Sequence, residues 1–341
     1  MKIIELFSGI GAQTQALKNL GISHTSICCE IDATTHSIYE AIHGKTPNLG
    51  DISKVEELPP CDLLTYSFPC QDLSSLGKQR GLDKNSNTRS SLLWEVGRLL
   101  ENMKERGVLP ETLLLENVKQ LVSPKNVANF NKWLEFLSNL GYTNVWQILN
   151  AKDFGIPQHR ERVFVVSSLT KKYEFATPNV VKTLKDFMDK DRDVIKEFGT
   201  RYFYSNPEMR EKIVKTINNT QSTNSTNRIY GRNSISHALT TQGSHPGNFG
   251  AILYSSDLKT SYELRKKIRM GKVDIDMDRI RLATPREVFR LMGFDEKSYK
   301  VAKKHMIKNG ININKFYHVS GNSIVVQVLE SIFKGLDIGK K

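Results

Sequence analysis

The 341-residue sequence is poor in cysteine, and its four thiols form no metal-binding or disulfide pattern. Cys28 and Cys29 are adjacent, whereas Cys61 and Cys70 stand alone, and none belongs to a Cys-x-x-Cys pair or a cluster with histidine. This spacing argues against zinc, so we expect no metal. The sequence also lacks an apolar run near the roughly 20 residues of a membrane span, and Glu5 interrupts the N-terminal stretch too early for a secretory signal. We therefore expect a cytoplasmic protein with reduced thiols.

Acidic residues are scarcer than basic ones, since 36 Asp and Glu stand against 49 Lys and Arg and leave a net charge of +13. The imbalance is concentrated in residues 169–280, which hold 20 basic and 13 acidic residues, and residues 212–256 contain no acid. Mixed charge and a hydrophobic content of 39% exclude a disordered chain and provide for a large core. The positive excess suggests a polyanionic partner, with nucleic acid as the first candidate.

The first 170 residues alternate between short apolar runs and amphipathic segments. The apolar runs predict buried strands at residues 2–7, 26–29, 63–67, 113–115, 145–149 and 163–167. Helices are predicted at residues 13–20, 91–106 and 126–140. This alternation is typical of a doubly wound α/β domain. After residue 169 polar, glycine-containing sequence replaces this rhythm, until a helical pattern at 323–333 that we expect to pack back on the first domain.

A loop with two glycines, Phe7-Ser8-Gly9-Ile10-Gly11, follows the first predicted strand and precedes a helix. Glycines at such a turn let the backbone approach a ligand at the helix N-terminus. A dinucleotide fingerprint needs a third glycine where the chain has Thr14, which disfavours a nicotinamide cofactor. Glu30 follows the second strand and Asp51 stands in a Gly-Asp-Ile turn. Carboxylates there suit a ribose diol and an adenine amino group, and the alternative is that both are solvated loop acids.

Four further side chains carry reactive chemistry near strand ends. Cys70 follows Pro69 just beyond the run 63–67, at the active edge of an open α/β sheet, although a lone cysteine is more often a small core residue. Glu116 follows three leucines, a place that favours an acid with a raised pKa over a solvated one. Arg160 and Arg162 stand two residues apart before the next strand and are expected to share one face.

These features belong to a longer ordered set of motifs. The sequence reads FSGIG, Glu30, GDI, PCQ, TRSSLLWE, ENV, QHRER, RLATPRE and GNS between Phe7 and Ser323. In this order and spacing it resembles the bacterial and phage DNA cytosine-C5 methyltransferases of the type II restriction–modification class. The resemblance covers essentially the whole chain. It implies an α/β, Rossmann-like catalytic domain that uses S-adenosylmethionine, together with a smaller, irregular target-recognition domain.

The resemblance also implies the reaction, in which a methyl group passes from S-adenosylmethionine to C5 of a cytosine flipped out of a short specific duplex DNA sequence. S-adenosylhomocysteine is then the product. Cys70 matches the nucleophile that adds to cytosine C6, and Glu116 matches the acid at N3. Arg160 and Arg162 match the cations near O2 and the cysteine. Water serves as the base that removes the C5 proton.

The cofactor site is implied in the same way. Phe7 matches the aromatic that packs on adenine, Glu30 the ribose acceptor and Asp51 the adenine contact. Ile31 stands where relatives often carry a bulky aromatic, so it offers less packing area. The full set of implied cofactor-binding residues is Phe7, Gly9, Gly11, Glu30, Ile31, Asp51, Ile52, Pro69, Leu92 and Asn322.

Residues that contact DNA are expected in two places. Residues 71–89 resemble the loop that closes over the flipped base, where Leu76 replaces a serine of some relatives and Arg89 faces DNA. In the acid-free segment, Arg228 is the first choice for a guanine contact because arginine pairs bidentately with O6 and N7. Thr240 and Gln242 are second choices for reading bases, and Arg232 is expected to hold phosphate.

The resemblance divides the chain into a catalytic and cofactor domain, residues 1–169 plus 314–341, and a target-recognition domain with its bracing segment, residues 170–313. Two alternatives stay open: a tRNA cytosine-C5 methyltransferase, and a catalytically inert DNA-binding relative. The long polar recognition segment favours DNA, and the intact Cys70 and Glu116 favour activity. The expected partner is duplex DNA, with a paired restriction endonuclease acting on the same site without contact. We expect a monomer with no membrane association.

Overall fold

The computed structural model describes residues 1–69, 92–198, 201–202, 229–231, 235–239, 251–253 and 280–336. The chain divides into two compact units. Unit 1 comprises Met1–Asn150, Glu161–Thr177 and Val326–Lys341, and unit 2 comprises Ala151–Arg160 and Pro178–Val325. The sequence-based division differs from this one, because it assigns residues 151–160 and 314–325 to the catalytic domain and residues 170–177 to the recognition domain.

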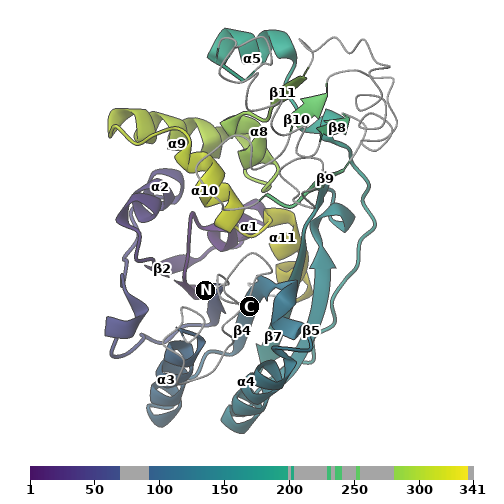
Figure 1. Cartoon of the computed structure of the whole chain (residues 1–341). Coiled ribbons are helices and arrows are strands. Elements are labelled where there is room, and N and C mark those ends of the chain that lie inside the picture. The colour runs from purple at the N-terminus through teal and green to yellow at the C-terminus, as the bar shows by residue number, and fades with distance from the viewer. Residues whose placement is uncertain are drawn as a thin grey trace. The chain divides into compact units, whose positions relative to one another are not determined.

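Unit 1 is built on a six-stranded sheet with the order β2-β1-β3-β4-β7-β5 (Figure 1). Its strands are β1 (Lys2–Leu6), β2 (Thr25–Cys29), β3 (Leu63–Tyr66), β4 (Thr112–Val118), β5 (Thr143–Asn150) and β7 (Glu161–Ser168). The first four are parallel, whereas β7 runs antiparallel to both of its neighbours. All six predicted strands are present to within a few residues.

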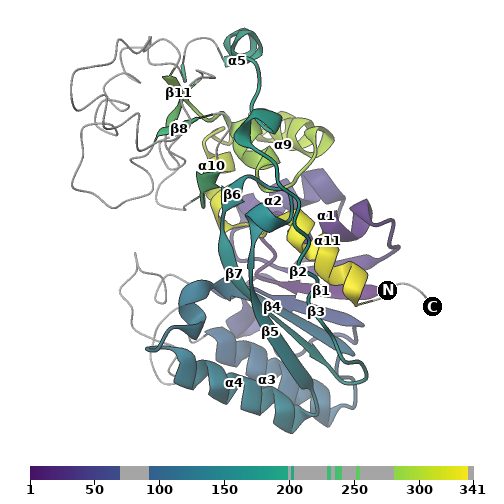
Figure 2. The same ribbon diagram turned by 90° about the vertical axis from the view of Figure 1, so that its right-hand side faces the viewer.

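Helices cover both faces of this sheet (Figure 2). One face carries α1 (Ala12–Asn19), α2 (Ala33–His43) and α11 (Val326–Gly335), and the other carries α3 (Leu92–Glu105) and α4 (Val127–Leu140). Trp133 of α4 is fully buried against the sheet and donates its Nε1–H to the Tyr66 hydroxyl at 3.2 Å. A short 3-10 turn at Ile52–Lys54 lies between α2 and β3, and another at Lys119–Val122 follows β4. The doubly wound α/β prediction is confirmed, and α2 is a helix that the pattern did not predict.

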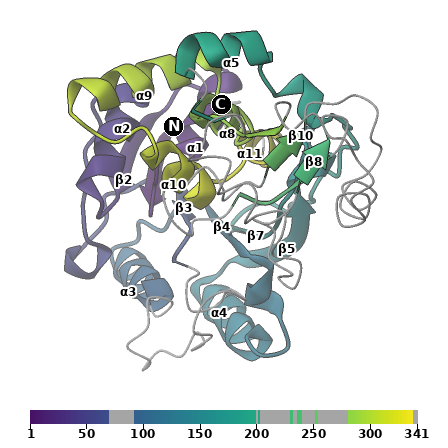
Figure 3. The same cartoon turned by 45° about the horizontal axis from the view of Figure 1, so that its top comes forward.

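Unit 2 combines short strands with helices. β6 (Gln158–His159) pairs with β9 (Ser236–His237), and a second sheet has the order β11-β10-β8. The other elements are the 3-10 turns Ala151–Asp153 and Leu184–Asp186, α5 (Asp191–Phe198), β8 (Ile229–Gly231), β10 (Ala251–Leu253), β11 (Ile280–Leu282), α8 (Pro285–Arg290), α9 (Glu296–Lys308) and α10 (Lys315–Asn322). In Figure 3, α8, α9 and α10 form one group. Phe289 of this group stacks on Phe294 with ring centroids 4.6 Å apart and meets Phe316 edge to face.

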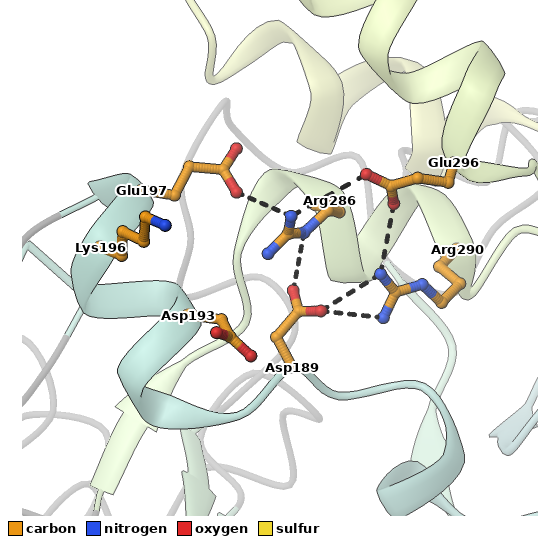
Figure 4. A pocket seen from close by; sticks show the side chains of 7 residues that line it. All are labelled: Asp189, Asp193, Lys196, Glu197, Arg286, Arg290 and Glu296. Atoms are coloured by element: carbon orange, nitrogen blue, oxygen red, sulfur yellow. Dashed lines mark hydrogen bonds and ion pairs between the residues drawn. The ribbon is translucent and has the colours of Figure 1, made fainter.

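Buried and half-buried ion pairs hold the middle of unit 2. Arg281 bonds the Glu287 carboxylate through both terminal nitrogens, at 2.7 and 2.5 Å, and both side chains are fully buried. Arg286 pairs with Asp189 and Glu197, each at 2.8 Å (Figure 4). These residues line a cavity of about 550 Å³. The ion pair between Arg286 and Glu197 joins α8 to α5 beside this cavity. Both arginines that line the cavity, Arg286 and Arg290, therefore already have acidic partners.

Two absences concern the described part of the chain. Its helices include none that is both long enough and apolar enough to cross a membrane. Nor do three or more of its His, Cys, Asp or Glu side chains gather where they could hold a metal ion.

Candidate active site

The loop between β1 and α1 has an unusual backbone that the sequence accommodates with glycine. Gly9 and Gly11 have φ values of +56° and +76°, and Phe7 adopts +58°, a left-handed conformation that costs energy in a residue with a Cβ. A Cβ on Gly11 would lie 2.7 Å from the His43 ring, whereas a Cβ on Gly9 would meet no atom of the described residues within 4 Å. The loop is therefore tightly supported at Gly11 and open at Gly9.

Glu30 lies directly beyond β2 and faces this loop. Its Oε2 accepts the Gly9 N–H at 3.0 Å, and its Oε1 accepts the Asp32 N–H at 2.9 Å. Backbone amides thus fix the half-buried carboxylate while each oxygen keeps a lone pair for another donor. A carboxylate with one free lone pair on each oxygen can accept hydrogen bonds from two vicinal hydroxyl groups. The neighbouring Ile31 is 73% exposed and offers an apolar surface.

Asp51 begins the turn after residues 47–50. Its Oδ1 accepts the Ser53 hydroxyl at 2.8 Å and the Ser53 N–H at 3.0 Å, and these bonds lower the pKa of the Asp51 carboxyl. Asp51 therefore stays ionised and acceptor-only at neutral pH. Ile52 next to it is buried in the core of unit 1. The fixed carboxylates of Glu30 and Asp51 can therefore accept hydrogen bonds from the hydroxyl or amino groups of a ligand.

A second carboxylate network lies beneath the glycine loop, and the sequence analysis did not assign it a role. Glu5 of β1 is fully buried, and its Oε1 accepts hydrogen bonds from Thr14 at 2.5 Å and Tyr39 at 2.7 Å. Burial raises the pKa of this carboxyl more than those bonds lower it. Among the described residues its Oε2 has no hydrogen-bond partner. The sequence feature that could have indicated this network is an acid, Glu5, inside an otherwise apolar predicted strand.

Glu116 and Arg162 form an ion pair that the sequence did not predict. Arg162 Nε lies 3.3 Å from Glu116 Oε1, and the side chains are 18% and 10% exposed. Glu116 lies inside β4 and not just beyond it, because the strand continues to Val118. The pair therefore places a carboxyl group, which can exchange a proton, beside a permanent cation.

Asn117, next to Glu116, connects β4 to the segment that follows β3. Its Nδ2 donates to the Phe68 carbonyl at 3.0 Å, and both side chains are buried. Phe68 stands two residues before Cys70 in the sequence, and the half-buried Pro69 lies between them. The backbone that leads to the predicted nucleophile is thus attached to the residue next to Glu116.

Arg160 is placed differently from the prediction. It lies between β6 and β7 and outside both, so strand alternation does not put Arg160 and Arg162 on one face. The Arg160 side chain is 3% exposed and donates to the carbonyls of Leu239, Gly321 and Ser323 at 2.7–3.0 Å. The Arg160 guanidinium therefore holds three backbone segments of unit 2 together.

The other predicted cofactor residues occupy two helices. Leu92 opens α3 in unit 1, half-buried and packed against the core. Asn322 ends α10 in unit 2, where its side chain is exposed and Nδ2 lies 3.4 Å from His318 Nε2. Seven predicted residues lie outside the described part of the chain: Cys70, Leu76, Arg89, Arg228, Arg232, Thr240 and Gln242.

The three cysteines that the structure describes are poor nucleophiles. Cys28 and Cys29 are buried and Cys61 is partly buried. Burial first, and a neighbouring carboxylate second, raise the pKa of each thiol to about 12. Because the thiolate is the reactive form, these three side chains are inert at neutral pH.

Comparison with known proteins identifies the family of this chain. The family model for the C-5 cytosine-specific DNA methylases matches residues 1–337. The chain belongs to this family. Among its relatives, the type II methyltransferase M2.ScrFI of Lactococcus lactis subsp. cremoris is 38% identical over 295 residues, covering 85% of this chain and 71% of the relative. The orphan methyltransferase M.SssI of Spiroplasma monobiae is 33% identical over 304 residues, covering 86% and 72%.

Solved structures of other methyltransferases have the same fold as this chain. The S. pombe Dnmt2 methyltransferase aligns with a TM-score of 0.67 at 23% identity, over 99% of both chains. The Entamoeba histolytica methyltransferase EhMeth aligns with a TM-score of 0.72 at 18% identity, again over 99% of both chains. The protein is therefore a DNA cytosine-C5 methyltransferase that acts on duplex DNA with S-adenosylmethionine as methyl donor, as the sequence predicted.

Proposed function

We propose that this methyltransferase acts through a covalent bond between Cys70 and cytosine C6, assisted by Glu116 and Arg162. The observation that carries the proposal is the contact chain from Arg162 through Glu116 to Asn117, whose amide holds the Phe68 carbonyl ahead of Pro69-Cys70. The three described thiols have pKa values of about 12, which leaves Cys70 as the candidate thiolate.

The chain's residues would divide the reaction as follows. The Cys70 thiolate adds to C6, and the electron pair displaced from the C5–C6 bond is stabilised as N3 takes a proton shared with Glu116. Arg162 holds the Glu116 carboxylate in place and balances its charge when the proton leaves. S-Adenosylmethionine, when bound, supplies the electrophilic methyl group that the enamine-like C5 accepts. N3 gives its proton back to Glu116, a water molecule removes the C5 proton, and the Cys70–C6 bond breaks to restore the aromatic ring and the thiolate.

The cofactor would be held along the carboxyl edge of β1, β2 and β3. Glu30 would accept the ribose hydroxyls, Asp51 the adenine amino group, and the backbone at Gly9 and Gly11 would lie under the methionine part. The remaining residues of the proposed set are Phe7, Ile31, Ile52, Pro69, Leu92 and Asn322. The open space at Gly9 and the fixed Glu30 carboxylate are what support this fit. S-Adenosylhomocysteine would leave from the same site.

DNA would be bound mainly by the basic second part of the chain, residues 170–313. A cytosine within a stacked duplex cannot reach a protein thiol, so base flipping is part of the proposal. From the sequence we propose Arg228, Thr240 and Gln242 as base readers, Arg232 as a phosphate contact, and Leu76 and Arg89 as contacts of the closing loop. Arg160 would act by positioning, since its guanidinium is engaged by carbonyl groups.

Substitution of the nucleophile tests the mechanism. We expect Cys70→Ser to abolish transfer of tritiated methyl groups to duplex DNA while DNA binding is retained. Duplexes that carry 5-fluorocytosine should trap a covalent complex with the wild type in the presence of the cofactor, because the C5 fluorine cannot leave as a proton. Continued methyl transfer by the variant, or no trapped complex with the wild type, would contradict the covalent mechanism.

Substrate choice and partners need separate measurements. Bisulfite sequencing of DNA from cells that express the chain should reveal one short methylated sequence, whereas methylation confined to tRNA would support the alternative activity. Light scattering should give the mass of a monomer, 38.8 kDa. Cleavage of unmethylated copies of the same sequence in the source cell would reveal the paired endonuclease.

A further inference from the structure

Residues 47–50 run beside β2 as a short extension of the sheet. The Cys28 N–H donates to the Pro47 carbonyl at 2.8 Å, and the Leu49 N–H donates to the Cys28 carbonyl at 2.8 Å. Cys28 and Asn48 form an isolated parallel β-bridge. At Gly50, with φ of +72°, the backbone turns toward Asp51. Asn48 therefore stands where the chain leaves the edge of the sheet for the Asp51 turn.

The Asn48 side chain bonds three backbone groups in two loops. Its Oδ1 accepts the Glu30 N–H at 2.9 Å and the Gly50 N–H at 3.0 Å. Its Nδ2 donates to the Glu30 carbonyl at 3.0 Å. One amide group thus holds the peptide of Glu30 to the turn that precedes Asp51. Because both peptides lie beyond the regular strand, no sheet ladder would otherwise satisfy these groups.

A second contact joins the same two loops from below. The buried Cys29 thiol, next to Glu30 in the chain, donates to the Gly50 carbonyl at 3.2 Å. The Glu30 carboxylate is held from its other side by the N–H groups of Gly9 and Asp32. The Glu30 backbone is thus fixed by Asn48 and its side chain by the glycine loop, so removal of Asn48 leaves the carboxylate anchored on one side only.

We propose that Asn48 is a positioning residue for the cofactor. It fixes the separation between the Glu30 carboxylate and the Asp51 turn, and it thereby sets the spacing at which the ribose and the adenine of S-adenosylmethionine are held together. The proposal rests on the proposed function, which assigns those two acids to the ribose and the adenine. Asn48 contributes through the backbone of Glu30 and Gly50, whose groups use both lone pairs of its Oδ1 and one hydrogen of its Nδ2.

The test compares Asn48→Ala with Asn309→Ala in the full chain. Asn309 is a matched control, because it is exposed and also bonds a backbone carbonyl, that of His305 at 2.8 Å, but belongs to unit 2. By calorimetry we expect N48A to raise the Kd of S-adenosylmethionine and S-adenosylhomocysteine about 10-fold, since three hydrogen bonds are lost. With saturating cofactor, kcat and the KM for DNA should stay within about 2-fold of wild type. N309A should leave all four quantities unchanged.

A double-mutant cycle separates positioning from general destabilisation. If Asn48 acts through Glu30, the 10-fold effect of N48A should shrink to under about 3-fold in a Glu30→Gln background. Equal effects in both backgrounds, or an unchanged Kd in N48A, would overturn the proposal. Should N48A not fold, Asn48→Asp keeps an acceptor oxygen and puts a charged, non-donating oxygen where Nδ2 bonds the Glu30 carbonyl. A Kd raised by about 3-fold would then support the proposal, and an unchanged Kd would overturn it.

These experiments distinguish the inference from the function on which it rests. If E30Q binds S-adenosylmethionine as tightly as wild type, the proposed cofactor site is wrong. If E30Q weakens binding and N48A does not, the cofactor site stands and only the role of Asn48 is refuted.

Discussion

Arg162 and Glu116 meet across two antiparallel strands, with Arg162 Nε 3.3 Å from Glu116 Oε1. The two side chains are 18% and 10% exposed, so solvent screens the pair only partly. An arginine remains charged at all physiological pH values. In the proposed reaction the Glu116 carboxyl takes up a proton from solvent before it shares that proton with cytosine N3. The pair couples a proton site to a permanent cation.

Removing the proton site should lower kcat and spare cofactor binding. We expect Glu116→Gln to reduce kcat by about 10²- to 10⁴-fold, the usual contribution of a positioned acid or base. Arg162→Gln should reduce it less, because the carboxylate would still be present. Single-turnover methylation and calorimetry with S-adenosylhomocysteine would measure the two effects. A change in cofactor Kd as large as the change in kcat would contradict this division of roles.

Loss of the Asn117 amide should disturb the backbone before Cys70. Asn117→Ala leaves the buried Phe68 carbonyl without its donor, at a cost of about 1–3 kcal/mol in the free energy of unfolding. We also expect a lower rate of covalent trapping on 5-fluorocytosine DNA, since the nucleophile would be less well oriented. Asn144→Ala, which removes a half-buried amide bonded to Leu134 and Ser138, is the control. Trapping equally slow in the control would indicate a general effect of destabilisation.

Glu5 should make the stability of the protein depend on pH. Burial raises the pKa of its carboxyl above the ordinary 4.5, so above that pH the folded chain keeps a proton that the unfolded chain has lost. The free energy of unfolding should therefore fall as the pH rises from about 4.5 through the raised pKa. Urea titrations at several pH values would measure this slope. Glu5→Gln, which cannot ionise, should flatten it, and an unchanged slope would exclude Glu5 as the cause.

Much of unit 1 could be predicted because buried parallel strands are written as short apolar runs. The run 63–67 is an example, since β3 (Leu63–Tyr66) is buried at every residue. Helix α2 was missed because its threonines and histidines are weak helix formers, yet Asp32 caps it by accepting the N–H groups of Thr34 and Thr35. The antiparallel direction of β7 could not be read from periodicity, which is the same for both directions.

The candidate site was predictable only where residue type and strand position sufficed. Glu30 and Asp51 could be found because each acid follows an apolar run or a glycine turn. Asn48 and Glu5 could not, because their roles depend on partners brought together by folding: Asn48 meets Glu30 from 18 residues away, and Glu5 meets Tyr39 across 34. Arg160 and Arg162 looked alike in the sequence and have different partners in the structure.

The two glycines of the cofactor loop should respond differently to alanine. Gly11→Ala introduces a Cβ 2.7 Å from the His43 ring, with φ at +76°, so we expect a loss of several kcal/mol in stability. Gly9→Ala meets open space and should cost only about 1 kcal/mol for its positive φ. G9A should nevertheless weaken S-adenosylmethionine binding at least as much as G11A, because the new methyl group would occupy ligand space. Thermal unfolding and calorimetry on both variants would reveal the contrast, and unaltered cofactor binding in G9A would place the ligand elsewhere.

The buried pair of Arg281 and Glu287 should be far more costly to break than to replace. Both side chains are fully buried, and although burial alone would raise the pKa of Glu287, Arg281 and the surrounding N–H groups lower it. Glu287→Leu leaves an unpaired buried guanidinium and should destabilise the protein by about 3–5 kcal/mol. Arg281→Met combined with Glu287→Leu removes both charges and should recover much of that loss, because two apolar side chains need no partner. Because the pKa of Glu287 is lowered, the contribution of the pair should also be lost as the pH falls from the ordinary 4.5 through the lowered pKa. Denaturant unfolding of both variants at neutral and acidic pH would measure these effects. A double variant less stable than Glu287→Leu alone would show that Arg281 stabilises unit 2 mainly through its carbonyl contacts with Asp189 and Leu282.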